Sequence, residues 1–306
     1  MVVMHSQGSD PHRTSSYTYI DELIGSMKLT VAGSRLLRQV SNRLYRGPLQ
    51  HIVQQLGLNK YLSKPYWWLV ITLADSTQTH SLADQTVSFH TETFDEFIRF
   101  RDLMGERPIL EDLLQSLESD DVFYDIGANV GTYTCFAASN LGPNAVVAFE
   151  PEPKNATRLR ENLDLNDLDA QIVDIALSDT NGTIELTLAD GDAGEGKHAI
   201  ATSGNQTTTE VETARGDTVV KEREVTPPTV AKIDVEGAEL SVLRGMEETL
   251  QEHCRLVYVE VHADKIGEYG GTAEDVYSVL EDAGFEIETV EQRGSQYFIK
   301  GTRQSR

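Results

Sequence analysis

Short apolar runs alternate with helically spaced apolar positions over the last two thirds of the chain. Runs of Val, Ile, Phe and Tyr predict strands buried on both faces, and apolar residues recurring every three or four positions predict helices between them. The strands predicted in this way are residues 122–125, 145–149, 172–177, 230–235 and 256–262. Strands that alternate with helices are typical of a doubly wound α/β fold.

Two hairpin-like features complete this region. Strands at 184–188 and 211–213 predict an antiparallel excursion, and the 189–210 segment between them is rich in Gly, Thr, Ser and Asp. A loop of that length inside a domain is usually a lid, a binding loop or disordered. The chain then predicts a last helix and a closing hairpin at residues 272–283, 285–290 and 296–300.

The N-terminal third lacks this alternation. Residues 1–16 are polar and are expected to form a disordered lead, whereas 17–108 predict an α+β extension. The main domain is expected at 109–306. Helices are predicted between 19 and 58 and at 94–104 and 109–117; a hairpin is predicted from strands 67–73 and 86–90, paired across the polar stretch 75–84.

Glycines follow the strand at 122–125. Gly127 and Gly131 lie four residues apart with Asn129 between them, and residues 132–137 suit a helix. Such glycines let the backbone approach a ligand, toward which a helix N-terminus presents free N–H groups. The spacing D-x-G-x-x-x-G differs from the G-x-G-x-x-G of dinucleotide binders. Asp125, at the strand end, suits an amino group or a sugar hydroxyl better than a phosphate.

Glu150 ends the next strand. An acid at this position accepts hydrogen bonds from ribose hydroxyls and repels a phosphate. The alternative is that this carboxylate only caps the helix that follows.

Further polar residues end the fourth and fifth strands. Asp234 lies at the tip of strand 230–235, with Glu236 two residues on. Alternation along strand 256–262 puts Glu260 and His262 on one side, opposite Val259 and Val261. Acids and an imidazole are therefore candidates to converge at one edge of the sheet. The alternatives are that Glu236 caps a helix beginning at Ala238, that Glu260 is a solvated strand end, and that His262 is structural.

Composition narrows the class of protein. The chain is 39% hydrophobic, and its longest mostly apolar run, 67–74, is too short to span a bilayer. The first residues do not resemble a signal peptide, so a cytoplasmic protein is predicted. Cys135 and Cys254 form no C-x-x-C pattern and are expected to be small buried apolar residues.

The charge is strongly negative. Acids outnumber bases 49 to 26, which gives −23, and only 9 of the 26 bases are lysines. Such a field disfavours nucleic acid and anionic lipid as partners. Dispersed acids with scarce lysine resemble the surface of a protein adapted to high salt, where repulsion is screened. The alternative is an acidic enzyme of an ordinary mesophile.

The segments DIGANVGTYT, AFEPEP, ALSD, KIDVEGAELSVLRG and VYVEVH together resemble the FkbM family of class I S-adenosylmethionine-dependent methyltransferases. The resemblance covers about residues 109 to 300. It implies a Rossmann-like seven-stranded methyltransferase sheet, with an N-terminal helical and hairpin extension here. It also implies O-methylation of a hydroxyl, commonly on a sugar or a polyketide-type product.

The resemblance further implies roles for individual residues. Glu236 joins Asp234 at the reacting end. The base is expected among Asp234, His262 and Glu260. A divalent ion held by Asp234, Glu236 and Glu260 is allowed but not favoured. The residues implied to bind S-adenosylmethionine are Asp125, Gly127, Asn129, Gly131 and Glu150, with Asp174 and Ala176 beside the adenine.

Three other classes compete with this interpretation. An NAD-dependent oxidoreductase would need three glycines in the loop, where this chain has Asn129 and Thr132 at the second and third positions. A catalytically idle S-adenosylmethionine-binding module requires that the acids near Asp234 not face the ligand. An N-methyltransferase would usually carry N/D-P-P-Y/F after the fourth strand, which ends here in IDVEG. A glycan sugar, including a hexuronic acid on a lipid-linked precursor for surface-glycoprotein assembly, is the acceptor that fits a salt-adapted member of the family.

Overall fold

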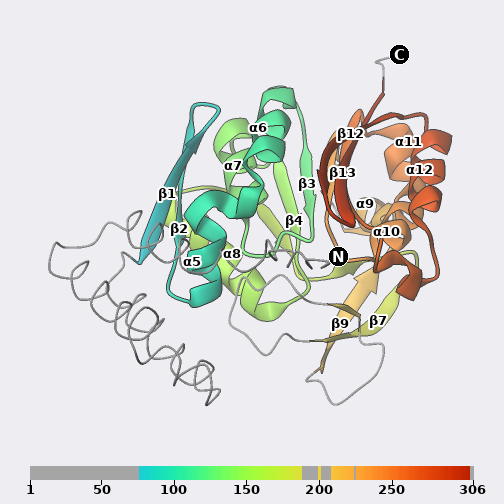
Figure 1. Cartoon of the computed structure of the whole chain (residues 1–306), viewed down its shortest axis with the longest axis horizontal. Coiled ribbons are helices and arrows are strands. Elements are labelled where there is room, and N and C mark those ends of the chain that lie inside the picture. Colours follow the sequence, from blue (N-terminus) through green and yellow to red (C-terminus); the bar gives the residue numbers. More distant parts are fainter. Residues whose placement is uncertain (1–75, 188–198, 201–207, 224, 304–306) are drawn as a thin grey trace, which may run out of the picture. The chain divides into compact units, whose positions relative to one another are not determined.

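Seven strands form the central sheet of the computed structural model, which describes residues 76–187, 199–200, 208–223 and 225–303 (Figure 1). All but the first of these residues belong to one compact unit, Thr77–Arg306. Along the sheet the strands are β12 (Glu286–Arg293), β13 (Gln296–Thr302), β11 (Leu256–His262), β10 (Val230–Ile233), β3 (Phe123–Ile126), β4 (Val146–Phe149) and β5 (Gln171–Val173).

The strand order reverses between β3 and β10. From β3 the chain builds outward through β4 to β5, then returns to β10 and continues through β11, all in parallel. Only β13 runs antiparallel to its neighbours, β11 and β12. A ligand crevice is expected at the carboxyl ends of the strands where the order reverses. The predicted doubly wound, seven-stranded sheet is confirmed.

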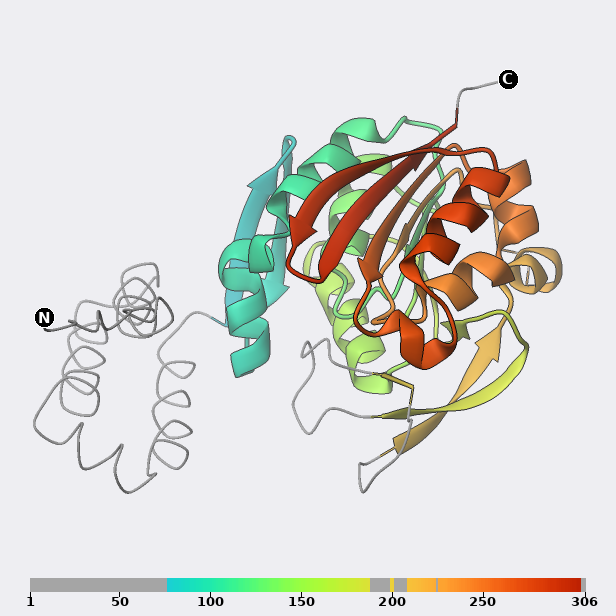
Figure 2. The same cartoon turned by 45° about the vertical axis from the view of Figure 1, so that its right-hand side comes forward.

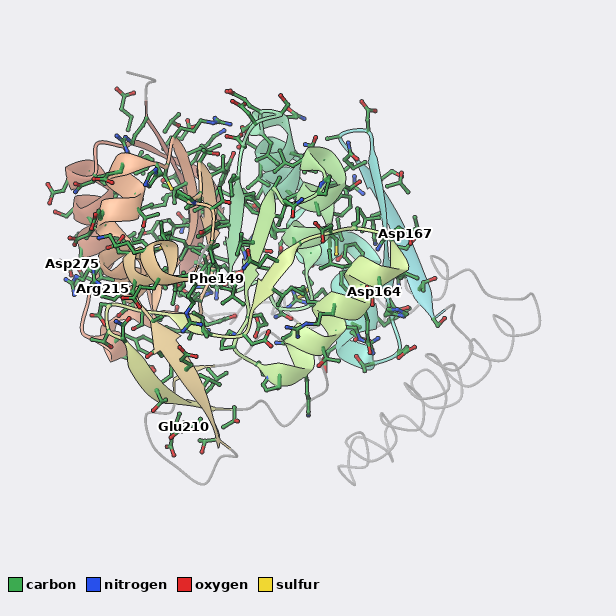
Figure 3. The ribbon with its side chains drawn as sticks, turned by 180° about the vertical axis from the view of Figure 1, so that it is seen from behind. Phe149, Asp164, Asp167, Glu210, Arg215 and Asp275 are labelled. Carbon is green, nitrogen blue, oxygen red and sulfur yellow. The ribbon has the colours of Figure 1, made fainter. Side chains whose placement is uncertain are left out.

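Helices cover both faces of the sheet (Figure 2). Neighbouring residues on β3 point to opposite cores, Phe123 into one and Tyr124 into the other. Phe149 lies in the interior in Figure 3. The helices of the Phe123 side are α6 (Arg107–Ser116), α7 (Thr132–Leu141) and α8 (Pro153–Leu165); those of the Tyr124 side are α9 (Gly216–Glu222), α10 (Glu239–Gly245), α11 (Glu247–Glu252) and α12 (Ala273–Asp282).

The N-terminal hairpin differs from the prediction. Strand β2 (Gln85–His90) pairs with β1 (Thr77–Leu82), which lies in the stretch expected to be the connection. The polar stretch 75–84, predicted to be a connection, therefore contains a strand, and the predicted pairing of 86–90 with 67–73 involves residues outside those described. A Thr-rich segment has good strand propensity, and the two turn residues Ala83 and Asp84, both at positive φ, fix the register. The lead predicted at 1–16, the helices at 19–58 and the strand at 67–73 lie outside the described residues.

Hairpin β1–β2 is attached to the rest of the unit. Asn162 of α8 accepts a hydrogen bond from the His90 backbone at 2.9 Å and donates one to the carbonyl of Val130 at 2.8 Å. Asn166 likewise accepts from the Ser88 backbone at 2.7 Å. The compact unit therefore contains residues 77–108, which were predicted to belong to an N-terminal extension. Asn162 connects that segment to the glycine loop.

The third predicted strand, 172–177, is divided in two. The backbone turns at Asp174, where the N–H of Ile175 donates to the carbonyl of Val173 at 2.9 Å. The second half, β6 (Ala176–Leu177), leaves the central sheet and pairs with β9 (Thr208–Ala214). The predicted antiparallel excursion is confirmed, since β9 pairs with β7 (Gly182–Thr187), and β7 also pairs with β8 (Ala199–Ile200).

The segment before β3 contains helix α5 (Phe94–Asp102) and the 3-10 turn η2 (Leu103–Gly105). A second 3-10 turn, η3 (Ile266–Tyr269), follows β11. Cys135 and Cys254 are buried and unpaired, as predicted. Among the residues that the structure describes, no helix has the length and apolar character needed to cross a bilayer.

Candidate active site

A cavity of about 470 Å³ lies at the carboxyl ends of β3, β4, β10 and β11, where the strand order reverses. Its volume is within the usual range for small-molecule sites. One part is lined by the glycine loop, Glu150 and residues 175–178, and another by polar side chains from β10, β11 and the segment before β3. The lining residues used below are Arg99, Glu106, Gly127, Asn129, Tyr133, Glu150, Ala176, Lys232, Asp234, Glu236, Glu260, His262, Lys265 and Arg293.

Gly127 is required by the close approach of two strands. Its φ is +81°, and a Cβ built on it would lie 1.9 Å from the carbonyl oxygen of Asp234. A hydrogen bond also joins β3 and the end of β10 here, because the Asp234 N–H donates to the carbonyl of Ile126 at 3.0 Å. Gly131 has a φ of +89° at the start of α7 and does not line the cavity. Gly127 therefore allows the carboxyl end of β10 to lie directly against the glycine loop.

Glu150 is a buried carboxylate in the cavity lining. It accepts hydrogen bonds from the backbone N–H groups of Asn129 at 2.7 Å and Glu152 at 2.9 Å. Burial raises its pKa to about 7. The side chain that caps α8 is Glu152, which accepts from the Asn155 N–H at 2.7 Å. The alternative role of Glu150 as a helix cap is therefore wrong.

Asp125 lies beneath the cavity and is not part of its lining. The Thr134 hydroxyl donates to its carboxylate at 2.6 Å, and the Lys232 ammonium lies 3.5 Å from the other oxygen. Lys232 and Asp125 are register partners on β10 and β3. The role predicted for Asp125 in binding the cofactor stays a prediction, and the observed contacts make it a counterion of Lys232.

Of the two residues predicted to lie beside the adenine, Asp174 and Ala176, only Ala176 lies at the cavity. Ala176 lines the cavity, as do its neighbours Ile175 and Leu177. Asp174 does not, because its carboxylate, 54% exposed, binds the guanidinium of Arg160 at 2.7 Å. The turn that divides strand 172–177 directs residue 174 away from the cavity and residue 176 toward it.

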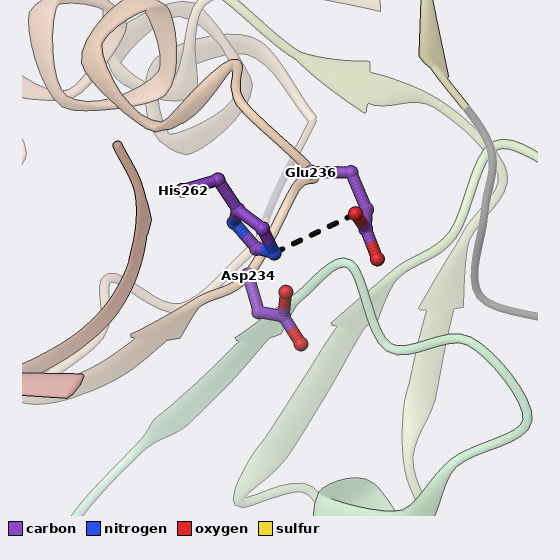
Figure 4. A group of neighbouring side chains, drawn as sticks. All are labelled: Asp234, Glu236 and His262. Carbon is purple, nitrogen blue, oxygen red and sulfur yellow. Dashed lines mark ion pairs between the residues drawn. The ribbon is translucent and has the colours of Figure 1, made fainter. Parts of the chain in front are cut away.

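Asp234, Glu236 and His262 converge at the opposite part of the cavity (Figure 4), with one ligand-type atom of each lying within 4.8 Å of the others. The Nδ1 of His262 is 2.8 Å from a Glu239 oxygen, and its Nε2 is 3.5 Å from Glu236. Burial alone would lower the pKa of His262, but Glu239 and the charges of Asp234 and Glu236 raise it to about 9. His262 is therefore an imidazolium at neutral pH in this state.

Glu236 does not cap α10. That helix begins at Glu239, and the Gly237 N–H that precedes it donates to the Glu239 carboxylate at 2.8 Å. Glu236 instead has a left-handed backbone, with a φ of 55°, and pairs with Lys265. A non-glycine residue in this region is uncommon and is often found at functional sites.

Glu260 is buried, with 8% of its surface exposed, so the alternative of a solvated strand end is wrong. Burial and the charge of Asp234 raise its pKa well above the usual range. Burial would raise the pKa of Asp234 too, but Lys232, at 3.1 Å, and His262 hold it below its usual value. The predicted alternation on β11 is confirmed, since Val259 and Val261 pack in the opposite core.

Two of the three carboxylates proposed for a divalent ion already have cationic partners. Lys232 pairs with Asp234, and Lys265 pairs with Glu236. The group of potential ligands contains His262 in place of Glu260. A divalent ion would have to displace two ammonium groups, so this donor set fits a metal poorly. The expectation from the sequence, a metal allowed but not favoured, stays a prediction.

Six of the cavity residues named above were not selected from the sequence. Lys232 could have been recognised, because a lysine inside a strand buried on both faces needs a counterion. The other five come from α5, the end of the turn after it, α7, the segment between β11 and η3, and β12, and no motif joins these elements. They are Arg99, Glu106, Tyr133, Lys265 and Arg293.

The comparisons with a family model and with known sequences identify methyltransferases. The model of the methyltransferase FkbM domain matches residues 125–287. The hexuronic acid methyltransferase AglP of Haloferax volcanii is 36% identical over 217 residues, covering 71% of this chain and 85% of that protein. The 31-O-demethyl-FK506 methyltransferase FkbM of Streptomyces tacrolimicus is 27% identical, covering 70% and 91%. The solved structure of methyltransferase FkbM from Methylobacillus flagellatus aligns with a TM-score of 0.44 at 16% identity, covering 66% of this chain and 49% of that one.

Proposed function

Because the chain belongs to the FkbM family of S-adenosylmethionine-dependent methyltransferases, we propose that it transfers the methyl group to an oxygen of a sugar, with a hexuronic acid as the first acceptor to test. The observation that carries the acceptor class is the similarity to AglP, a hexuronic acid methyltransferase, over 85% of that protein's length.

The residues present fit the cofactor. Gly127, Asn129 and Glu150 line the same part of the cavity. The Oδ1 of Asn129 is buried and has no hydrogen-bond partner in the part of the chain that the structure describes. A buried unpaired acceptor is costly, and a bound ligand would satisfy it. When bound, S-adenosylmethionine supplies a methyl group that its sulfonium already makes electrophilic.

The other part of the cavity supports proton transfer and orientation. Asp234 is ionised at neutral pH and can accept a hydrogen bond from the acceptor hydroxyl. Glu260 has the raised pKa that suits a proton acceptor working near neutral pH. His262, as an imidazolium, fits a hydrogen-bond donor that holds Glu236 and Glu239 better than it fits the base. The sequence analysis predicted the base among Asp234, Glu260 and His262. The charge states described here favour Glu260 as the base, with Asp234 assisting it.

Two guanidinium groups in the lining are compatible with an anionic sugar. Arg99 lies 4.0 Å from Glu106 and Arg293 pairs with Glu291 at 2.7 Å, so an acceptor carboxylate would share these groups with carboxylates of the chain. It is the similarity to AglP that supports a uronic acid over a neutral sugar. A cytoplasmic location for the reaction stays a prediction from the sequence.

The test is transfer of labelled methyl from S-adenosylmethionine to matched pairs of acceptors, glucuronoside against glucoside and galacturonoside against galactoside. We expect label in the uronosides. Mild alkali then separates a stable methyl ether, formed on a hydroxyl, from a labile ester, formed on the carboxylate. Transfer only to the neutral sugars would overturn the choice of a hexuronic acid, and absence of transfer to every sugar would overturn the acceptor class.

A further inference from the structure

Tyr133 is a buried tyrosine whose hydroxyl has no hydrogen-bond partner among the described residues. It is the second residue of α7, directly after the glycine loop, and only 3% of its surface is exposed. Its ring lies 4.8 Å from the Lys232 ammonium and forms part of the cavity lining. Packing and a cation–π contact therefore hold the ring of Tyr133 beside the reacting end of the cavity, while its hydroxyl makes no hydrogen bond to the described residues.

The surroundings keep this hydroxyl protonated. Burial, followed by the charges of Glu106, Asp234 and Glu260, raises the pKa of Tyr133 far above its usual range. All three carboxylates line the same cavity. Tyr133 thus presents a neutral phenol, which is a hydrogen-bond donor, in a region otherwise rich in acceptors.

The other fully buried tyrosines have partners. The Tyr124 hydroxyl donates to the carbonyl of Thr226 at 2.9 Å, and the Tyr258 hydroxyl donates to the carboxylate of Asp112. Both rings pack in the same domain, with no exposed surface. Since buried polar groups are normally paired, an unpaired hydroxyl next to a cavity points to a ligand as its partner.

We propose that the Tyr133 hydroxyl donates a hydrogen bond to an oxygen of the acceptor and so orients the reacting oxygen toward Asp234 and Glu260. The residue is an acceptor-positioning group and forms no covalent bond. The proposal rests on the proposed function for the class of acceptor, a sugar, and on the cavity for the place of contact.

The test compares Tyr133→Phe with Tyr124→Phe, each of which removes one buried hydroxyl and keeps the ring. Tyr133→Phe should keep the affinity for S-adenosylmethionine in calorimetry and lower kcat/KM for the uronoside by roughly 2- to 10-fold, the value of one hydrogen bond between neutral groups. It should melt no lower than the wild type, because no hydrogen bond is lost. Tyr124→Phe should melt lower and keep its kcat/KM.

Either arm can overturn the inference. Undiminished transfer by Tyr133→Phe, in a preparation where the wild type methylates the uronoside, overturns the role of Tyr133 and leaves the proposed function standing. A wild type that methylates no sugar overturns the proposed function, and the melting comparison then decides on Tyr133: a marked loss of stability in Tyr133→Phe would show that its hydroxyl has a structural partner.

Discussion

At the scale of single residues, the site is organised by the charge of Lys232. Its ammonium lies 3.1 Å from Asp234 and 3.5 Å from Asp125, and only 2% of the residue is exposed. Burial would lower the pKa of this lysine, but the two aspartates and Glu106 raise it. A buried lysine with two counterions keeps Asp234 ionised, and the charge of Asp234, together with burial, raises the pKa of Glu260.

This division of charge predicts different outcomes for two isosteric substitutions. Asp234→Asn should spare S-adenosylmethionine binding and lower turnover by roughly 10²- to 10⁴-fold, because the hydroxyl loses a charged acceptor and Glu260 loses the neighbouring charge that raises its pKa. Glu260→Gln should lower turnover by a similar factor and also remove the rise of activity with pH near neutrality. Initial rates of methyl transfer across pH measure both. If Glu260→Gln kept the wild-type pH profile, Asp234 would be left as the base.

His262 predicts a pH dependence of stability. Its folded pKa of about 9 exceeds the ordinary value of 6.5, so its contribution is fully present below pH 6.5 and is lost as pH rises through 9. The difference in unfolding free energy between wild type and His262→Gln should therefore shrink over this window, by about 3 kcal/mol at most. Urea titrations at pH 6 and pH 9.5 measure it. Glu239→Gln removes the main partner of His262, so in that background the effect of His262→Gln on the unfolding free energy should change less with pH. If the difference between wild type and His262→Gln grew as the pH rose, the raised pKa of His262 would be contradicted.

At the scale of elements, the approach of β10 to the glycine loop is the tightest constraint on the cavity. Gly127→Ala should lose S-adenosylmethionine binding and several kcal/mol of stability, because its Cβ would collide with the Asp234 carbonyl. Gly270→Ala is the matched control. Its φ of +77° is similar, but no atom lies within 4 Å of the added Cβ, so only the backbone cost of about 1 kcal/mol remains. Equal losses in the two variants would refute the steric argument.

The elements also mark how far sequence reasoning reached. Core strands such as β4 and β10 were predictable because a buried parallel strand reads as a continuous apolar run, and the motifs placed Glu150 at the end of β4 and Asp234 at the end of β10. The partner of β2 was missed, because TQTHSL has few apolar residues and its strand is specified by the turn at Ala83 and Asp84. Pattern reasoning favours apolar segments and overlooks a polar strand of this kind.

Contacts between elements that are distant in the sequence place the remaining cavity residues, Arg99, Glu106 and Arg293. Arg99 and Glu106 precede the methyltransferase motifs and reach the cavity only because η2 turns there, with Leu103, Met104 and Gly105 all at positive φ. Arg293 of β12 donates to the carbonyl of Gly105 at 2.8 Å, which joins the two ends of the compact unit at the cavity. No sequence spacing encodes such a meeting, since it depends on the tertiary fold.

At the scale of the whole molecule, negative charge is spread over separate elements. Asp164, Asp167, Glu210 and Asp275 come from α8, the turn after it, β9 and α12, and they lie around the periphery in Figure 3. Some acids occupy unfavourable positions. The last turns of α8, α11 and α12 contain no basic residue, and they carry Asp164, Glu252 and Asp282. Negative charge at a helix C-terminus opposes the helix dipole, an effect that salt screens.

The net charge of −23 and these helix ends predict that salt stabilises the fold. Repulsion among exposed carboxylates acts over about 10 Å at 0.1 M salt and about 3 Å at 1 M, so the melting temperature should rise from low to molar KCl. Thermal melts in a KCl series measure this, with sorbitol at equal osmolarity as the uncharged control. Replacing Asp164 and Asp282 by Asn should raise the midpoint at low salt and reduce its slope with KCl. If the melting temperature rose equally in sorbitol, or did not change with KCl, the acidic composition would be that of an ordinary mesophilic enzyme and would reflect no adaptation to salt.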